Sequence, residues 1–298
     1  MSAVIEVRGL GKKFPGNDFY SLRDATFDLN EGDIIGLVGR NGSGKSTLLK
    51  MLSKAQRPTE GTIHYNGKDI FSAPNILDDF GFMIEPAFFP QISVEENLEF
   101  FLKIQKKNHD RPKIAPTLEL VGLWEARKRK PRTFSFGMKQ RTALAIALVS
   151  KPSIVFLDEP FVGLDPVGVQ SLLDILKKWS SENGTSMIIS SHQLNELREL
   201  CNRYLFIESG NLTDNVNDNL IKTTVTLNAE AEGNIDETLS KILLESNVAF
   251  EGHRIAIPST LDNALMNRLY MELGSRNLIK SVDSRKDSLE NLFKGEDK

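Results

Sequence analysis

The stretch that decides the fold class is Gly39-Arg40-Asn41-Gly42-Ser43-Gly44-Lys45-Ser46-Thr47. It fits the pattern G-x-x-x-x-G-K-[ST] and lies between a short apolar run, residues 33–38, and a helical pattern, residues 46–54. Glycines let such a turn fold tightly, so that successive amide groups point inward at phosphate oxygens. The following helix adds its positive dipole end. This strand–turn–helix order predicts a nucleotide-binding loop rather than a chance glycine-rich turn.

The residues of this loop have predicted roles. We expect Lys45 to reach the β- and γ-phosphates and the Ser46 hydroxyl to ligate Mg²⁺. The remaining contacts with the nucleotide are expected from Gly39, Asn41, Gly42, Ser43, Gly44 and Thr47. The loop therefore predicts a nucleotide with bound Mg²⁺ as the ligand.

A second apolar run, residues 154–157, ends in two acids, Asp158 and Glu159. The carboxyl ends of strands are where α/β sheets hold ligands. We expect Asp158 to hold the magnesium through its water shell and Glu159 to polarise the attacking water as a base. Alone, Asp-Glu after a strand is more often only the start of a turn, so the assignment depends on the phosphate loop.

Composition limits the class of partner and the setting. A net charge of -3 leaves no excess of positive charge for nucleic acid. The single cysteine, Cys201, cannot form an internal disulfide, which fits a reducing cytoplasm. Residues 143–157, the longest apolar region, are interrupted by polar residues and Pro152, and the N-terminus does not resemble a signal peptide. We expect a soluble chain that reaches a membrane only through a partner.

Strand and helix patterns alternate over most of the chain. Residues 3–8 and 26–29 predict an antiparallel sheet at the N-terminus. Further strand-like runs occupy residues 33–38, 61–65, 80–84, 154–157, 186–190 and 204–208. Residues 94–148 are mostly helical. Strands that alternate with helices predict an α/β fold with a parallel sheet.

A polar stretch, residues 211–219, contains four asparagines and two aspartates and predicts a linker. After it, strand or helix patterns occur at residues 223–227, 235–245, 248–257, 261–273, 279–282 and 289–294. This order suits a small ferredoxin-like α+β module, either a structural appendage or a regulatory one.

Three more segments stand in a fixed order, Phe134-Ser135-Phe136-Gly137-Met138-Lys139-Gln140-Arg141, Gly163-Leu164-Asp165 and Ser190-Ser191-His192. They resemble, in turn, the signature, the D-loop and the switch-histidine segment of ATP-binding-cassette (ABC) ATPases. Phe14 stands where that family has its adenine-stacking aromatic. With the phosphate loop and the two acids, these motifs cover residues 14–192, and the chain is identified as a member of the ABC ATPases.

The resemblance implies a fold and a division of the chain. Residues 1–214 would form the nucleotide-binding domain, an α/β P-loop NTPase with a RecA-like parallel sheet, an antiparallel N-terminal sheet and a helical subdomain at about residues 90–150. Residues 215–298 would form the small C-terminal α+β domain. The cofactors would be ATP and Mg²⁺.

The resemblance also implies roles for side chains. Ser135 and Gly137 would contact the γ-phosphate of ATP bound to another subunit. His192 would bind the same phosphate and hold Glu159 and the water in line. The remaining nucleotide contacts would come from Phe14, by stacking on adenine, and from Asp165. Taken alone, a histidine or phenylalanine of this kind is more often a surface or core residue.

Two positions depart from the family pattern. Glu85 replaces the usual Q-loop glutamine, and a carboxylate there would still bind magnesium or its waters. Phe136 and Met138 replace glycine and glutamine in the signature. The signature, Glu85 and the ending at residues 287–293 are similar to ATPases of two-component ABC-2-type exporters, which implies export.

One phosphate loop and one signature per chain imply a dimer, most simply a homodimer. The conduit would be a permease on a separate membrane chain, with this chain peripheral at the cytoplasmic face. The alternatives are a soluble ABC ATPase that acts on a cytosolic assembly and a nucleotide-binding regulator without turnover, which the intact Glu159 disfavours. Two features argue against the soluble alternative. Ribosome-associated members of the family carry two cassettes in one chain, and DNA-repair members carry long insertions between the phosphate loop and the signature, whereas this sequence has neither.

Two adjacent phenylalanines, Phe88 and Phe89, follow Glu85 closely. In this family the groove beside the Q-loop receives a short helix of the membrane subunit. Strand-like alternation would turn the two rings to opposite sides. We therefore expect one ring in the core and the other on the surface that meets the permease, although a pure core role is an open alternative.

Overall fold

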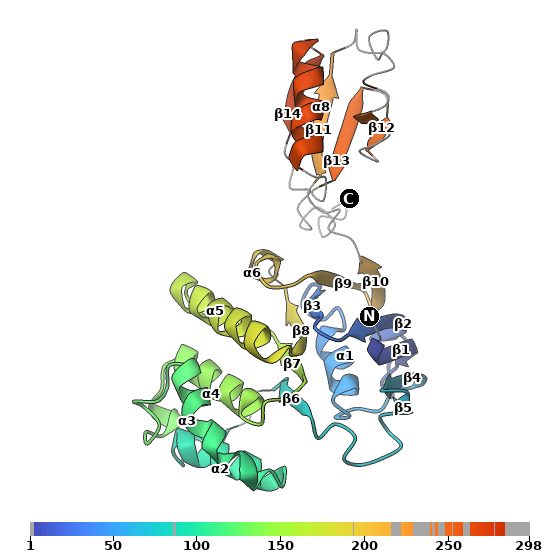
Figure 1. Ribbon diagram of the computed structural model, residues 1–298. Helices are drawn as coiled ribbons and strands as arrows, with labels where there is room; N and C mark the ends of the chain where they lie inside the picture. Colours follow the sequence, from blue (N-terminus) through green and yellow to red (C-terminus); the bar gives the residue numbers. More distant parts are fainter. Residues whose placement is uncertain are drawn as a thin grey trace. The chain divides into compact units, whose positions relative to one another are not determined.

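The computed structural model describes residues 3–85, 88–192, 194–215, 222–228, 239, 242–243, 248–251, 253–258, 263–276 and 278–283. The chain divides into two compact units, Met1–Asn215 and Val216–Lys298, each with a sheet of its own (Figure 1). Of the described helices, none is both long enough and apolar enough to cross a bilayer.

The first unit contains one ten-stranded sheet in the order β5-β4-β1-β2-β10-β9-β3-β8-β7-β6. Its strands are β1 (Ala3–Lys12), β2 (Leu22–Asn30), β3 (Ile34–Val38), β4 (Glu60–Tyr65), β5 (Lys68–Asp69), β6 (Phe80–Met83), β7 (Ile154–Asp158), β8 (Ser186–Ser191), β9 (Arg203–Glu208) and β10 (Asn211–Asn215). The five strands from β9 to β6 run parallel, whereas β1, β2, β4 and β5 pair antiparallel. The predicted combination of a parallel and an antiparallel sheet is confirmed.

The linker predicted at residues 211–219 is wrong for its first five residues, which form β10. Ser209 and Gly210 both have positive φ angles, 48° and 81°, the geometry of a tight hairpin turn that returns the chain antiparallel to β9. The Arg203 guanidinium then binds the carboxylate of Asp214 on the neighbouring strand. Cross-strand pairing therefore outweighs the poor strand propensity of asparagine and aspartate. Residues 216–219 lie outside the described residues.

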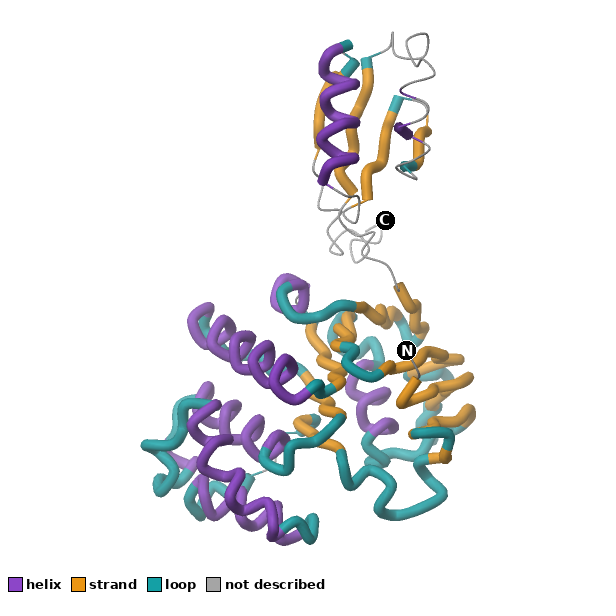
Figure 2. Tube along the Cα trace, viewed as in Figure 1, coloured by secondary structure: helices purple, strands orange, loops and turns teal. Residues whose placement is uncertain are grey.

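Helices cover the sheet and extend from it (Figure 2). They are α1 (Lys45–Leu52), α2 (Val94–Ile104), α3 (Ile114–Leu120), α4 (Phe136–Leu148), α5 (Pro166–Asn183) and α6 (Leu194–Arg198), with short 3-10 turns at Asn108–Lys113 and Pro131–Thr133. α2, α3 and α4 form a group beside β6 (Figure 1). α4 approaches β6 so closely that a β-carbon on Gly81 would collide with the Ala147 carbonyl oxygen.

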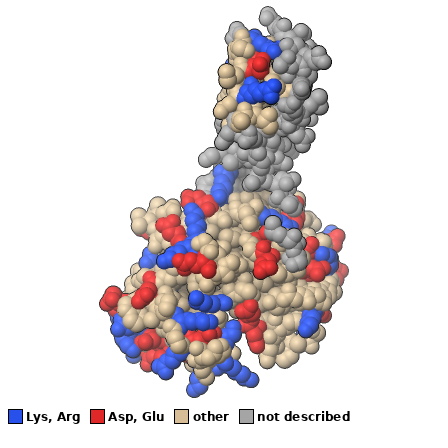
Figure 3. All heavy atoms as spheres, viewed as in Figure 1, with Lys and Arg blue, Asp and Glu red and all other residues tan. Residues whose placement is uncertain are grey.

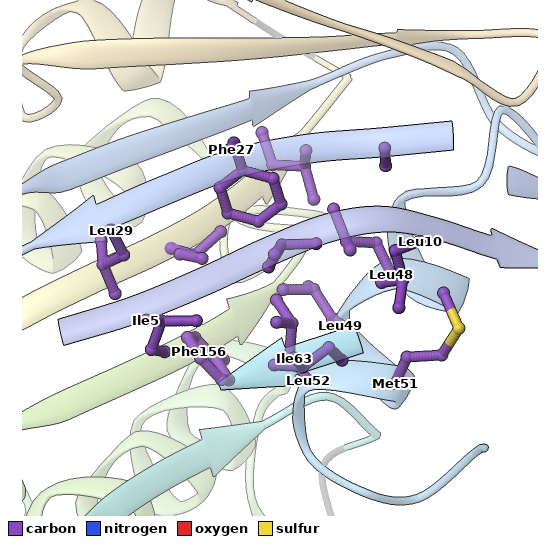
Figure 4. Close-up of a cluster of buried hydrophobic side chains, with 14 of the residues drawn as sticks. Ile5, Leu10, Phe27, Leu29, Leu48, Leu49, Met51, Leu52, Ile63 and Phe156 are labelled. Atoms are coloured by element: carbon purple, nitrogen blue, oxygen red, sulfur yellow. The ribbon is translucent and has the colours of Figure 1, made fainter. Parts of the chain in front are cut away.

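The main core fixes the helix that follows the phosphate loop. Side chains from β1, β2, β4 and β7 converge on α1, whose Leu48, Leu49 and Leu52 are buried (Figure 4). A fully buried leucine stabilises a fold by about 1.5–3 kcal/mol. This apolar face therefore holds the start of α1, and with it Lys45, in a fixed place against the sheet.

The second unit is a four-stranded antiparallel sheet in the order β12-β13-β11-β14. Its elements are β11 (Lys222–Leu227), β12 (Ala249–Glu251), β13 (Arg254–Pro258), α8 (Asn263–Ser275) and β14 (Ile279–Asp283). Buried residues of the strands and of α8 share one core with Leu239, Ile242 and Leu243. The expected α+β pattern is present. The helix predicted at residues 289–294, and most of the one at 235–245, lie outside the described residues.

Candidate active site

The phosphate loop is folded so tightly that two of its glycines have no substitute. Gly44 has φ 118°, and a β-carbon there would collide with the carbonyl oxygen of Ser21. A β-carbon on Gly39 would lie 2.4 Å from the carbonyl oxygen of Ile207 and 2.5 Å from Ser43 Oγ. Neighbouring backbone therefore determines the shape of residues 39–47, the segment we refer to as the cradle, before any ligand binds.

Lys45 and Ser43 place buried polar atoms in the cradle. The Lys45 side chain is only 5% exposed, and Nζ donates to the carbonyl oxygens of Gly39 (2.7 Å) and Arg40 (3.2 Å). Among the described residues, Ser43 Oγ is buried and has no hydrogen-bond partner. An unpaired buried hydroxyl is costly unless a ligand satisfies it, so the cradle suits an anion with several oxygens.

The two acids at the end of β7 are aligned by Ser190 on the neighbouring strand β8. The register pairs Asp158 with Ser190, whose Oγ donates to Asp158 Oδ1 (2.5 Å). The same Oγ accepts the backbone N–H of Glu159 (2.9 Å), which has a left-handed φ of 48°. Ser190 therefore fixes both acids. The sequence pattern indicates no separate role for Ser190, although this residue opens the Ser190-Ser191-His192 segment.

Glu159 lies between a lysine and a histidine. Its Oε1 is 3.1 Å from Lys45 Nζ, and its Oε2 is 2.8 Å from His192 Nδ1. Because β8 lies between β3 and β7, three adjacent strand ends carry the cradle, His192 and the acids. The structure thus brings together four predicted residues: Lys45, Asp158, Glu159 and His192. A carboxylate held on both sides has a defined orientation toward the mouth of the cradle.

Behind the switch segment, Ser191 Oγ donates to Glu196 Oε2 on α6 (3.0 Å). Burial raises the pKa of the Glu196 carboxyl above its usual range, and the hydrogen bond from Ser191 opposes that shift. The pair anchors the strand end that carries His192. Glu196 belongs to none of the quoted motifs, and nothing in the local sequence pattern indicates that its side chain turns back toward Ser191.

The three residues predicted to hold magnesium are not brought together equally. Asp158 is fixed beside the cradle, and the exposed Ser46 follows Lys45 in the first turn of α1. Their oxygen atoms suit Mg²⁺, which keeps several waters and phosphate oxygens as ligands. Glu85 is 79% exposed, and its carboxylate pairs with Lys50 Nζ at 2.6 Å. Among the described residues, no group of three or more His, Cys, Asp and Glu could hold a metal.

Phe14 lies just beyond the end of β1, half-buried, with Lys12 Nζ 5.3 Å from its ring centroid. The same loop carries Phe19, which is 63% exposed. The loop ends at Ser21, whose carbonyl oxygen borders Gly44 of the cradle. Either ring is therefore on a segment that adjoins the cradle, and stacking of Phe14 on adenine stays a prediction.

The signature and the D-loop form a second, separate region. Ser135 caps α4 by accepting from Met138 N (3.3 Å), and Asp165 caps α5 by accepting from Gly168 N (2.9 Å). These caps, with Gly137 and Gly163, line a hollow of about 480 Å³ whose described lining includes no residue of the cradle. Within one chain, the structure does not bring Ser135, Gly137 or Asp165 together with Lys45.

A phosphate loop on a parallel sheet, with acids at a neighbouring strand end, defines the class as a P-loop nucleoside triphosphatase. Within that class, the family model described as ABC transporter matches residues 22–162. The chain belongs to the ABC transporter ATP-binding proteins and is an ATPase. The resemblance inferred from the motifs is confirmed.

The names of the relatives include one import protein and transport proteins whose names state no direction. The chain is 34% identical to the uncharacterised ABC transporter ATP-binding protein YcbN of Bacillus subtilis, over 72% of this chain and 70% of that protein. It is 32% identical to the bacitracin transport ATP-binding protein BcrA of Bacillus licheniformis, over 98% and 97%. It is 31% identical to the methionine import ATP-binding protein MetN of Cupriavidus pinatubonensis, over 71% and 64%.

The fold resembles a dimeric structure of a post-hydrolysis state of the ATP-binding cassette MJ0796 bound to ADP and Pi. The TM-score is 0.63 at 23% identity, over 72% of this chain and 99% of that one. At this identity the likeness concerns the fold alone, and it confirms the ABC cassette fold.

Proposed function

We propose that this chain is one of two identical ATPase subunits that power export through a separate membrane permease. Residues 1–214 would be the nucleotide-binding domain and residues 215–298 the small C-terminal domain. The observation that carries the proposal is the placement of Glu159 between Lys45 and His192, apart from the signature. Such a chain holds the base and the phosphate-binding groups but needs a second copy to complete the site.

The residues of the cradle would act on ATP as follows. The triphosphate would accept hydrogen bonds from the loop amides, Ser43 Oγ and Lys45 Nζ, which already lies among acceptor oxygens. Glu159 would take a proton from the attacking water, and His192, 2.8 Å away, would hold the carboxylate in line. Magnesium would be held by Ser46 directly and by Asp158 through water, and it would neutralise phosphate charge. Glu85 would join these ligands only if its carboxylate left Lys50.

The second copy would cover the signature surface. Phe136, Val162 and Val167 are 50%, 40% and 76% exposed, and all three belong to or adjoin the signature and the D-loop. Apolar side chains grouped on a surface favour a partner that removes them from water. In a symmetric dimer, Ser135 and Gly137 of one copy would face ATP in the cradle of the other.

The permease would meet a different surface, the Phe89 patch, which consists of Phe89, Phe100 and Ile104 with exposed fractions of 45%, 38% and 61%. The rings of Phe89 and Phe100 lie 4.6 Å apart. The buried Asn97 side chain binds both backbone groups of Phe89 (2.7 and 3.0 Å), which holds the ring outward. The neighbouring Phe88 is half-buried. This geometry supports the prediction that one ring of the pair serves the partner.

Export is favoured by the resemblance of the signature, Glu85 and the sequence at residues 287–293 to ATPases of ABC-2-type exporters. The likeness to the bacitracin transport protein covers both units of this chain, whereas the likeness to the methionine import protein covers 71% of it. The surface charge does not point to a nucleic-acid partner instead, since basic and acidic side chains are interspersed over the face drawn in Figure 3. Through its permease the chain would lie at the cytoplasmic face of the membrane.

The experiment that tests this proposal is recovery of the tagged chain from membranes, followed by mass spectrometry of what accompanies it. We expect a multi-spanning membrane protein in stoichiometric amount, and reconstituted vesicles that move solute outward with ATP. Recovery with a cytosolic assembly and no membrane protein would contradict the proposal and favour a soluble ABC ATPase.

A further inference from the structure

The signature and the D-loop pack against each other at two places, and at each place a large side chain of one segment lies against a glycine of the other. A β-carbon on Gly163 of the D-loop would lie 2.8 Å from Phe136 Cε1, so the Phe136 ring fills the space beside that glycine. A β-carbon on Gly137 of the signature would lie 3.3 Å from Leu164 Cδ2. Each segment therefore contributes one large side chain and accepts the other's at a glycine.

The D-loop is in turn connected to the catalytic carboxylate by two consecutive turns. Val162 N donates to the Glu159 carbonyl oxygen (3.3 Å), and Leu164 N donates to the Phe161 carbonyl oxygen (3.2 Å). Phe161 is only 3% exposed, which anchors this short stretch in the core. Because two hydrogen-bonded turns connect residues 159 and 164, we expect a displacement of Gly163 to shift the backbone of Glu159.

We propose that Phe136 is a positioning residue that ties the signature to the D-loop, so that contact of the signature with ATP on a second copy sets the position of Glu159 in its own chain. This inference rests on the proposed function for the partner's ATP, but the contact itself lies within one chain. It explains why a bulky ring stands half-exposed where the family has glycine. Leaving half of the ring in water is unfavourable, but its packing against Gly163 holds the two loops rigidly together.

The contact is tested first in the nucleotide-free subunit, by hydrogen exchange of the amides of residues 161–165. Phe136→Ala should speed their exchange about fivefold, the size of one lost aromatic contact, while Phe136→Leu stays within about twofold. Val167→Ala removes apolar surface at the same hollow without touching Gly163 and serves as the matched control. Unchanged exchange in Phe136→Ala, or an equal change in Val167→Ala, would overturn the proposal.

The consequence is tested in ATP turnover. Phe136→Ala should lower kcat about fivefold and bring the Hill coefficient for ATP close to 1, with KM within about twofold, because the cradle is untouched. Phe136→Leu should restore most of the rate. A change confined to KM would overturn the proposal. The two proposals can fail separately. If the Glu159→Gln variant stays monomeric in the presence of ATP, the proposed dimeric function is wrong. If Phe136→Ala nevertheless speeds exchange of the D-loop amides, the contact between Phe136 and Gly163 is still supported.

Discussion

The two halves of the candidate site are built in opposite ways. In the cradle, the charged groups partner one another within the chain: Lys45 binds two carbonyl oxygens, and Glu159 lies between Lys45 and His192. At the signature, the polar side chains cap their own helices, and the rings and methyl groups around them are exposed. A region that is internally paired can receive a small ligand by exchanging partners. A region that is exposed and apolar favours a surface of another chain that would remove it from water.

The largest effect expected in the cradle concerns chemistry rather than binding. Glu159→Gln keeps the size of the side chain but removes the base, so turnover should fall by about 10²–10⁴-fold while ATP binding survives. Steady-state phosphate release measures the first and calorimetry the second. The variant should accumulate as an ATP-bound dimer. Hydrolysis near the parent rate would show that Glu159 is not the base.

Lys45→Ala should have the next largest effect, because it removes the buried cation that faces the phosphates. Loss of a charged hydrogen bond of this kind weakens affinity for ATP by about 10–100-fold. Calorimetry with Mg-ATP measures this loss, and Lys68→Ala, which removes an exposed lysine of β5, is the control. Undiminished affinity of Lys45→Ala would remove the basis for the cradle.

The comparison also shows what a sequence can and cannot predict. The cradle and the acids are local: short runs of residues whose spacing implies their geometry, and the structure places them together. Ser190, Glu196 and the fit of Phe136 against Gly163 depend on which strands and loops become neighbours, and no local pattern indicates that. β10 was missed for a different reason: its asparagines and aspartate have poor strand propensity, which the tight turn at residues 209–210 and the pairing with β9 outweigh. The sequence predicted that one ring of the Phe88–Phe89 pair would face the surface, but it indicated neither which ring nor the hydrogen bonds from Asn97 to the Phe89 backbone.

A smaller effect is expected at the Phe89 patch, which lies outside both halves. Phe89→Ser should reduce recovery of the permease about tenfold, the scale of one apolar contact at an interface, and leave ATP binding by the isolated subunit unchanged. Met271→Ser, which alters a residue that is 75% exposed in the second unit, controls for general surface effects. Full recovery of the permease with a lowered melting temperature would mean that Phe89 serves the core alone.

The smallest effect separates two aromatic rings on one loop. Phe14→Ala should weaken ATP and ADP about fivefold to the same degree, because stacking on adenine does not involve the γ-phosphate. Phe19→Ala, a change in the more exposed ring, should stay within about twofold. If Phe19→Ala has the larger effect, the adenine-stacking role belongs to Phe19.

The central claim is that each ATP site combines the cradle of one copy with the signature of the other, and two mixed dimers test it directly. In the first, one copy carries Lys45→Ala and the other Ser135→Arg, which places both lesions at one composite site. In the second, one copy carries both substitutions and the other none, which damages both sites. Phosphate release should persist in the first dimer and be lost in the second. Loss in the first and persistence in the second would show that each chain uses its own signature, and would contradict the account.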